Sequence, residues 1–208
     1  MKERFKHFSD PRFRRSLFLA VFLLLISLTI NFYAGIYATE KASNAVTDII
    51  LSNTRAYDLD EIFVYGSWVL VAFIAYVCAK RPSKAPYIIK SIALFVIIRA
   101  AFITMTHLGP FPQAAVISPT SFIRYFVFGG DLFFSGHTGL PFLLALIFWD
   151  EPRLKWIFLL TSLFFGAVVL LAHLHYTIDV LSAFFISYGI SHIALKLFKK
   201  DREFFLSP

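Results

Sequence analysis

A polar segment in the second half of the chain could bind a phosphate group and move a proton. It leads into an apolar run that begins at Gly136, and its sequence is Gly129-Gly130-Asp131-Leu132-Phe133-Phe134-Ser135-Gly136-His137-Thr138. A flexible Ser135-Gly136 step before a helix leaves several N–H groups without an intrahelical partner, and these groups and the helix dipole favour an anion. His137 can give or take a proton there. A purely structural histidine at an interface is the alternative.

A second polar segment lies between two apolar runs near the end of the chain, and its sequence is His175-Tyr176-Thr177-Ile178-Asp179-Val180. His175 and Asp179 are four residues apart, so on a helix they share one face. A carboxylate beside an imidazole fixes its tautomer and raises its basicity, as a nucleophilic or general-base histidine requires. The alternative is a pair that only bridges two helices, although an acid at a membrane boundary is costly enough to favour function.

Arg99 is a charged residue inside an apolar run, nine residues before Leu108. An arginine in a membrane is costly unless it is paired or reaches water, and its planar fork suits phosphate oxygens. The alternative is that Arg99 pairs with Asp131 or Asp179 and only holds helices together.

The composition is that of an integral membrane protein. The 208 residues are 58% hydrophobic, 18% aromatic and 16% charged, whereas an average soluble domain is about 45–50% apolar and about 25% charged. This apolar excess excludes a small soluble domain, and the aromatic content excludes a disordered chain. Because Cys78 is the only cysteine, an intramolecular disulfide and a cysteine-based metal cluster are excluded.

Six apolar runs predict an all-α membrane protein that is a bundle of six transmembrane helices. A hydrocarbon core about 30 Å thick needs roughly 20 residues of helix, and the runs lack the two-residue alternation of barrel strands. The runs are Ser16–Ala38, Ile62–Ala79, Ala85–Leu108, Gly136–Trp149, Leu154–Leu174 and Ile178–Phe198, of which the fourth is short. We expect a basic cytoplasmic leader at 1–15, one catalytic domain at 16–198 and a cytoplasmic tail at 199–208.

The distribution of charge predicts the orientation in the membrane. The formal net charge is +7, and sixteen of the 20 Lys and Arg residues share one side if six spans alternate. Basic loops stay in the cytoplasm, so both termini are expected there, next to anionic lipid headgroups; a nucleic-acid partner is not expected. The loops at 39–61 and 109–135 then lie on the non-cytoplasmic side, where His137, His175 and Arg99 are expected to meet.

Two histidines, an aspartate and an arginine suit phosphoryl transfer without a metal or cofactor. One histidine would attack phosphorus, the other would protonate the leaving alkoxide, and Arg99 with backbone amides would stabilise the developing charge. Arg124, an arginine in the loop, could supplement Arg99. The two histidines and an aspartate could instead bind zinc, but the Ser-Gly-His step beside Arg99 favours an anion over a cation.

Ser135-Gly136-His137 and His175-x3-Asp179 resemble the second and third motifs of the type 2 phosphatidic acid phosphatase superfamily, which uses a six-helix bundle. The longer strings are similar to its sphingomyelin synthase branch, where Cys-Gly-Asp-x3-Ser-Gly-His-Thr precedes His-Tyr-Thr-x-Asp-Val; here Gly129 replaces the cysteine. The stretch from Arg99 to Pro112 loosely resembles the branch's arginine-containing third-helix motif. The resemblance covers roughly residues 99–183.

The resemblance implies a role for each matching residue. His175 would be the nucleophile that forms a phosphohistidine, Asp179 its orienting partner, and His137 the acid and base for the leaving and entering alcohols. Arg99, Ser135 and Gly136 would bind substrate; Asp131 has the branch's spacing to Ser135 and could contact a headgroup amine or position Arg124. The implied reaction moves a phospho-headgroup from a phospholipid donor to a lipid alcohol, which is ceramide in the resembled branch.

Two motifs of the phosphatase branch are missing. Its Lys-x6-Arg-Pro motif is absent because Lys90 and Arg99 are nine apart and Ala100 follows, and its Ser-Arg step is replaced by Val168-Val169. With fewer cations, a phosphodiester monoanion is a better substrate than a phosphomonoester dianion. The alternatives are a lipid phosphatase or phospholipase C-type hydrolase with water as acceptor, and a lipid-binding or transport protein without catalysis.

Overall fold

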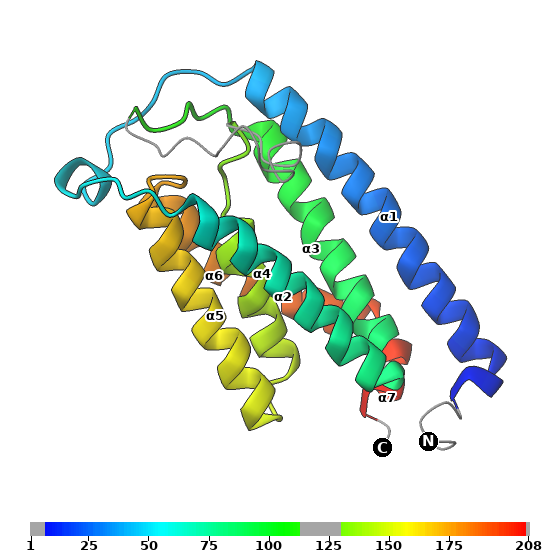
Figure 1. Cartoon of the computed structure of the whole chain (residues 1–208). Coiled ribbons are helices and arrows are strands. Elements are labelled where there is room, and N and C mark those ends of the chain that lie inside the picture. Colours follow the sequence, from blue (N-terminus) through cyan, green and yellow to red (C-terminus); the bar gives the residue numbers. More distant parts are fainter. Residues whose placement is uncertain (1–6, 113–129, 207–208) are drawn as a thin grey trace.

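The computed structural model describes residues 7–112 and 130–206, which form a helical bundle (Figure 1). Its α-helices are α1 (Pro11–Glu40), α2 (Asp60–Lys80), α3 (Ala85–Met105), α4 (Gly136–Ile147), α5 (Pro152–Leu171), α6 (Thr177–Leu197) and α7 (Lys199–Leu206). Two 3₁₀ turns, η2 (Leu51–Asn53) and η3 (Pro82–Lys84), lie in the connections. The described residues include no strand, and the predicted all-α class is confirmed.

Five helices in the described part of the chain, α1, α2, α3, α5 and α6, are long and apolar enough to cross a membrane. The fourth predicted span is α4, which is apolar but has only 12 residues. At about 1.5 Å per residue it is shorter than the hydrocarbon core. It packs against α5 and α6 (Figure 1). The structure therefore bears out a multi-pass membrane protein, and a count of six spans stays a prediction.

The helix α5 ends at Leu171, earlier than the predicted Leu174, because the chain there turns into a Schellman motif. His173 has a left-handed backbone, with φ of 55°. The N–H of His173 donates to the Leu170 carbonyl at 3.0 Å, and the N–H of Leu174 donates to the Val169 carbonyl at 2.9 Å. These two bonds satisfy the last carbonyls of α5, so the following residues form a turn instead of continuing the helix.

Gly139 on α4 allows three helices to pack closely. A Cβ at this position would lie 2.8 Å from Ser187 Oγ of α6 and 3.0 Å from the Phe95 ring of α3. We expect Gly139→Ala to lower the free energy of unfolding by about 1–3 kcal/mol, the usual cost of overpacking. Gly189→Ala on α6 is the matched control, because nothing lies within 4 Å of its added Cβ. Thermal unfolding in detergent micelles compares them, and equal melting temperatures would contradict the expectation.

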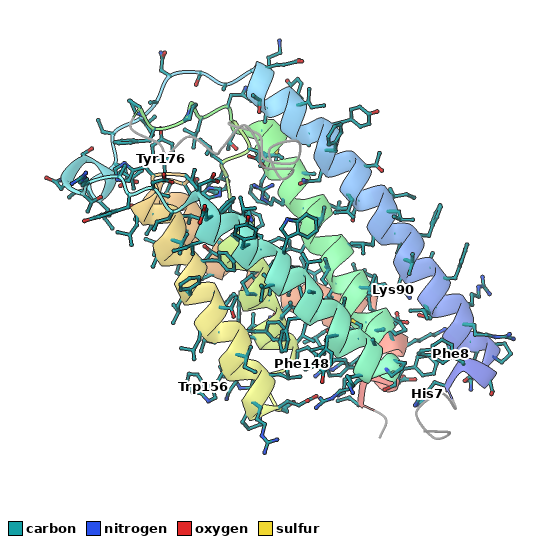
Figure 2. The ribbon with its side chains drawn as sticks, viewed as in Figure 1. His7, Phe8, Lys90, Phe148, Trp156 and Tyr176 are labelled. Carbon is teal, nitrogen blue, oxygen red and sulfur yellow. The ribbon has the colours of Figure 1, made fainter. Side chains whose placement is uncertain are left out.

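The helix α7 forms where the sequence suggested only a tail. Lys90 Nζ of α3 donates to Asp201 Oδ2 at 2.7 Å and to Ser16 Oγ of α1 at 2.9 Å, and the Ser16 hydroxyl donates to Asp201. The Phe205 ring is buried, with its centroid 5.5 Å from that of Tyr87. These contacts attach α7 to α1 and α3 at the end of the bundle where α1 begins (Figure 1; Lys90 is labelled in Figure 2).

Removing one member of the buried Lys90–Asp201 pair is expected to cost more than removing both. Asp201→Leu leaves a buried ammonium group without its counter-ion, which typically costs about 3–5 kcal/mol. The double variant Lys90→Met/Asp201→Leu leaves no buried charge, so it should unfold at a higher temperature than Asp201→Leu. Glu203→Leu, at an exposed position of the same helix, is the control. A melting temperature of Asp201→Leu equal to that of the wild type would show that the pair contributes nothing.

Candidate active site

Ser135 is the N-cap residue of α4, so the Ser-Gly-His step lies at a helix N-terminus. Its buried Oγ accepts a hydrogen bond from the Thr138 N–H at 3.4 Å and lies 3.1 Å from the Thr138 hydroxyl. The cap uses one of the first amides of the helix, whereas the amides of Gly136 and His137 have no acceptor within the helix. These amides and the positive end of the helix dipole can bind an oxyanion.

The His137 ring lies between aromatic side chains of two other helices. Its centroid is 4.3 Å from that of Phe63 on α2 and 5.8 Å from that of Phe165 on α5. The side chain is half-buried. The preceding residue, Gly136, lies against the Arg99 side chain, so His137 belongs to a helix start that Arg99 contacts.

Arg99 of α3 holds the segment that precedes α4. Its Nε donates to the Phe134 carbonyl at 3.0 Å, and its Nη2 donates to the Asp131 carbonyl at 2.6 Å. Nη2 also forms an ion pair with Asp131 Oδ2 at 3.2 Å. A Cβ on Gly136 would lie 3.1 Å from Nε, so glycine allows the guanidinium to approach the helix start.

These contacts modify the role expected of Arg99. The pairing with Asp131, which the sequence offered as the alternative to phosphate binding, is present. Two of the three guanidinium nitrogens organise the loop, and Nη1 makes no hydrogen bond to the described residues. Desolvation raises the pKa of Asp131, while the charges of Arg99 and His175 oppose that rise. An anion at the site would therefore meet a guanidinium that is already positioned by its own chain.

His175 and Asp179 approach each other, but not in the way the sequence suggested. His175 Nδ1 lies 3.4 Å from Asp179 Oδ2, and both side chains are buried. The expected shared helix face is wrong for His175, since α6 begins at Thr177 and His175 lies in the preceding turn. Asp179 Oδ2 also accepts the Tyr176 N–H at 2.9 Å. The carboxylate therefore caps the helix start and faces the imidazole with the same oxygen.

One backbone hydrogen bond joins the two polar segments. The N–H of Ser135 donates to the carbonyl of Asp179 at 3.1 Å. It connects the N-cap of α4 to the first turn of α6, two elements that are 44 positions apart in the sequence. Together with the contacts of Arg99, this bond brings residues of α3, α4 and α6 to one place in the bundle.

The sequence did not indicate the contacts of two residues beside this site. Asp48, in the loop between α1 and α2, accepts hydrogen bonds from Thr177, which follows the His175 turn. His173 is buried, its Nε2 is 3.3 Å from the Thr54 hydroxyl, and its ring packs edge-on against Phe111 at 5.3 Å. Burial lowers the pKa of His173, and the Asp48 carboxylate opposes this effect. In the sequence, the only signal for Asp48 was that the 39–61 loop is acidic, with Glu40, Asp48, Asp58, Asp60 and Glu61.

Two further predictions concern Arg124 and zinc. Arg124 lies outside the described residues. Within residues 7–112 and 130–206, no group of three His, Cys, Asp or Glu side chains is arranged to hold a metal ion. The donor set expected for the zinc alternative is therefore not assembled in the described part of the chain.

Comparison with known proteins found one similarity, which lies in the segment that carries the site. Searches among curated proteins and among solved structures each found no match. Residues 129–195, however, match the family model described as PAP2 superfamily C-terminal. The matched segment contains His137, His175 and Asp179. This segment, which is less than half of the chain, is thus similar to the type 2 phosphatidic acid phosphatase superfamily.

Proposed function

We propose that the protein is a membrane-embedded lipid phosphotransferase that moves a phospho-headgroup from a phospholipid donor to a lipid alcohol, as sphingomyelin synthases do. The observation that carries the proposal is the Ser135–Asp179 backbone bond, because it joins the helix N-terminus beside His137 to the His175–Asp179 pair. In this proposal His175 is the nucleophile, His137 is the acid, and the N-terminus of α4 binds the anion, the three functions that covalent phosphoryl transfer requires.

In the first step, His175 Nε2 attacks phosphorus while Nδ1 faces the Asp179 carboxylate. The bond from phosphorus to the diacylglycerol oxygen breaks, and His137 gives its proton to that oxygen. In the second step, His137 takes a proton from the acceptor hydroxyl, whose oxygen attacks phosphorus and breaks the bond to Nε2. Arg99 and the amides of Gly136 and His137 stabilise the charge on the equatorial oxygens in both steps.

The residues that precede the His175 turn favour a phosphodiester donor. Val168 and Val169 occupy the place where the phosphatase branch has Ser-Arg, and both are buried in a cluster with Phe63 and Val180. With valines there, the site has few cations to neutralise a phosphomonoester dianion. A diester carries only one negative charge, which suits Arg99 and a helix N-terminus.

We further propose that the site opens to the non-cytoplasmic face, with both termini in the cytoplasm. The start of α1 and helix α7 lie at one end of the bundle, since Ser16 bonds to Asp201 and the Phe13 ring contacts Phe204. Basic residues are concentrated at this end, which favours the cytoplasm. The His175 turn lies at the other end, beneath the α1–α2 loop (Figure 1).

Purified protein in vesicles, supplied with a headgroup-labelled phospholipid, tests the proposal. With a lipid alcohol present, label should move to a new lipid, and diacylglycerol should appear in equal amount. Release of water-soluble labelled phosphate or phosphobase alone would identify a hydrolase instead. Absence of both products with a panel of donors would leave the lipid-binding or transport alternative.

A further inference from the structure

The turn that carries His175 is held from outside by the loop between α1 and α2. Asp48 of this loop accepts the Thr177 N–H on Oδ2 at 2.7 Å and the Thr177 hydroxyl on Oδ1 at 2.8 Å. The same Oδ1 accepts the N–H groups of Ile50 and Leu51 at 2.9 and 3.1 Å. The carboxylate therefore joins the α1–α2 loop to the first residue of α6.

The surroundings of Asp48 keep its carboxylate charged. The residue is 9% exposed. Burial alone would raise its pKa, but the hydrogen bonds from Leu51, Thr177 and Ile50 outweigh burial and hold the pKa below its usual value. An ionised carboxylate at the N-terminus of α6 also interacts favourably with the helix dipole.

The next residue back, Tyr176, is held in a similar way. Its hydroxyl accepts the Val46 N–H at 3.2 Å and donates to the Gly109 carbonyl at 2.8 Å. Tyr176 is fully buried and lies where the α1–α2 loop meets the α5–α6 turn (Figure 2). Tyr176 is thus bonded to the α1–α2 loop and to Gly109 after α3, whereas Thr177 is bonded to the α1–α2 loop.

Two carboxylates hold the two consecutive amides that follow His175. The Tyr176 N–H donates to Asp179 and the Thr177 N–H donates to Asp48. Because these amides follow His175 directly, they constrain the backbone from which the imidazole approaches Asp179 at 3.4 Å. One of the two constraints comes from the α1–α2 loop, which lies outside the matched segment at 129–195.

We propose that Asp48 is a positioning residue for the nucleophile: it fixes the start of α6 and, through the backbone, the imidazole of His175. This inference rests on the proposed function for its catalytic meaning. Asp48 itself forms no bond to substrate and takes no proton. Its effect is on the rate of the chemical steps, because a misplacement of about 1 Å at a reacting group can cost about 100-fold in rate.

Asp48→Asn tests the proposal without changing the size of the side chain. An amide has one acceptor oxygen, so its nitrogen faces donors on either the Thr177 side or the Ile50 side. We expect kcat for headgroup transfer to fall about 10- to 100-fold, with KM for the donor lipid nearly unchanged. Asp58→Asn, an exposed acid of the same loop, should match the wild type. A wild-type kcat for Asp48→Asn would overturn the proposal.

A double-mutant cycle separates positioning from a general loss of loop structure. Thr177→Val removes the hydroxyl that donates to Asp48, so its effect should largely disappear in the Asp48→Asn background. Additive effects of the two substitutions, with kcat falling in proportion to the melting temperature, would overturn the proposal in favour of a structural role.

A spectroscopic measurement tests the positioning role of Asp48 even if the protein is not a transferase. In protein with ¹⁵N-labelled histidine, the His175 resonances are assigned by their loss in His175→Gln. We expect these resonances to move in Asp48→Asn and those of His192, at an exposed position on α6, to stay. Unchanged His175 resonances would overturn the positioning role. A wild-type protein that transfers no headgroup would refute the proposed function alone.

Discussion

Replacing His175 with glutamine is expected to abolish headgroup transfer and leave the helical bundle intact. The variant has no imidazole Nε2 to form the bond to phosphorus, and losses of about 10⁴-fold or more follow when a covalent nucleophile is removed. Transfer of label from phospholipid to lipid alcohol measures the rate. In the wild type, quenching in base during turnover should trap a labelled phosphoprotein that is lost in acid, the stability expected of a phosphohistidine.

The control for this prediction is His192→Gln. His192 is exposed, and its ring lies 4.4 Å from that of Tyr188 one turn earlier on α6, far along the helix from Thr177. This variant should keep wild-type activity and the same melting temperature as His175→Gln. Retained transfer by His175→Gln would exclude His175 as the nucleophile, whatever else the protein does.

Replacing His137 with glutamine is expected to lower the rate with natural lipid donors by about 10²–10⁴-fold, the usual contribution of general acid–base catalysis. The diacylglycerol alkoxide is a poor leaving group and needs the proton that His137 supplies. A 4-nitrophenyl phosphodiester has a leaving group that departs without protonation. Formation of the phosphoenzyme from that donor should therefore be much less impaired in His137→Gln.

One comparison distinguishes the proposed roles of His137 and His175. Burst release of 4-nitrophenol measures the first step alone, and it should persist in His137→Gln and be absent in His175→Gln. An equal loss in both variants would contradict the division of roles. Since His137 packs against Phe63 and Phe165, thermal unfolding of His137→Gln must accompany the assay to show that the bundle is intact.

The sequence was sufficient to predict where the long helices lie, but it did not predict all of their ends. Apolar runs long enough to cross a membrane follow from composition, and the structure has a helix in each. The end of α5 was misplaced because His173 adopts a left-handed conformation that glycine usually occupies. Helix α7 was missed because its charged residues suggested a tail, whereas the burial of Asp201 depends on Lys90, far away in the sequence.

The site was predictable where its contacts are local. The helix start after Ser135 and the approach of Asp179 to His175 follow from spacing within a few residues, whereas the capping role of Ser135 was not predicted. The bond between Asp48 and Thr177 joins positions 129 apart, and no local pattern indicates it. For Arg99, the fork geometry that suits a phosphate also suits the carbonyls of the 131–134 segment. Only the fold shows that these carbonyls are in reach.

The bond between the Ser135 N–H and the Asp179 carbonyl uses atoms that nearly every amino acid possesses. A substitution at either position therefore leaves this backbone hydrogen bond possible. In contrast, a single substitution of Asp48 removes its hydrogen bonds to Thr177. The contact between the Ser135 and Asp179 segments should therefore tolerate substitutions better than the contact between Asp48 and Thr177. Among random variants that are selected for headgroup transfer, we therefore expect few changes at Asp48, and we expect the backbone bond between positions 135 and 179 to persist.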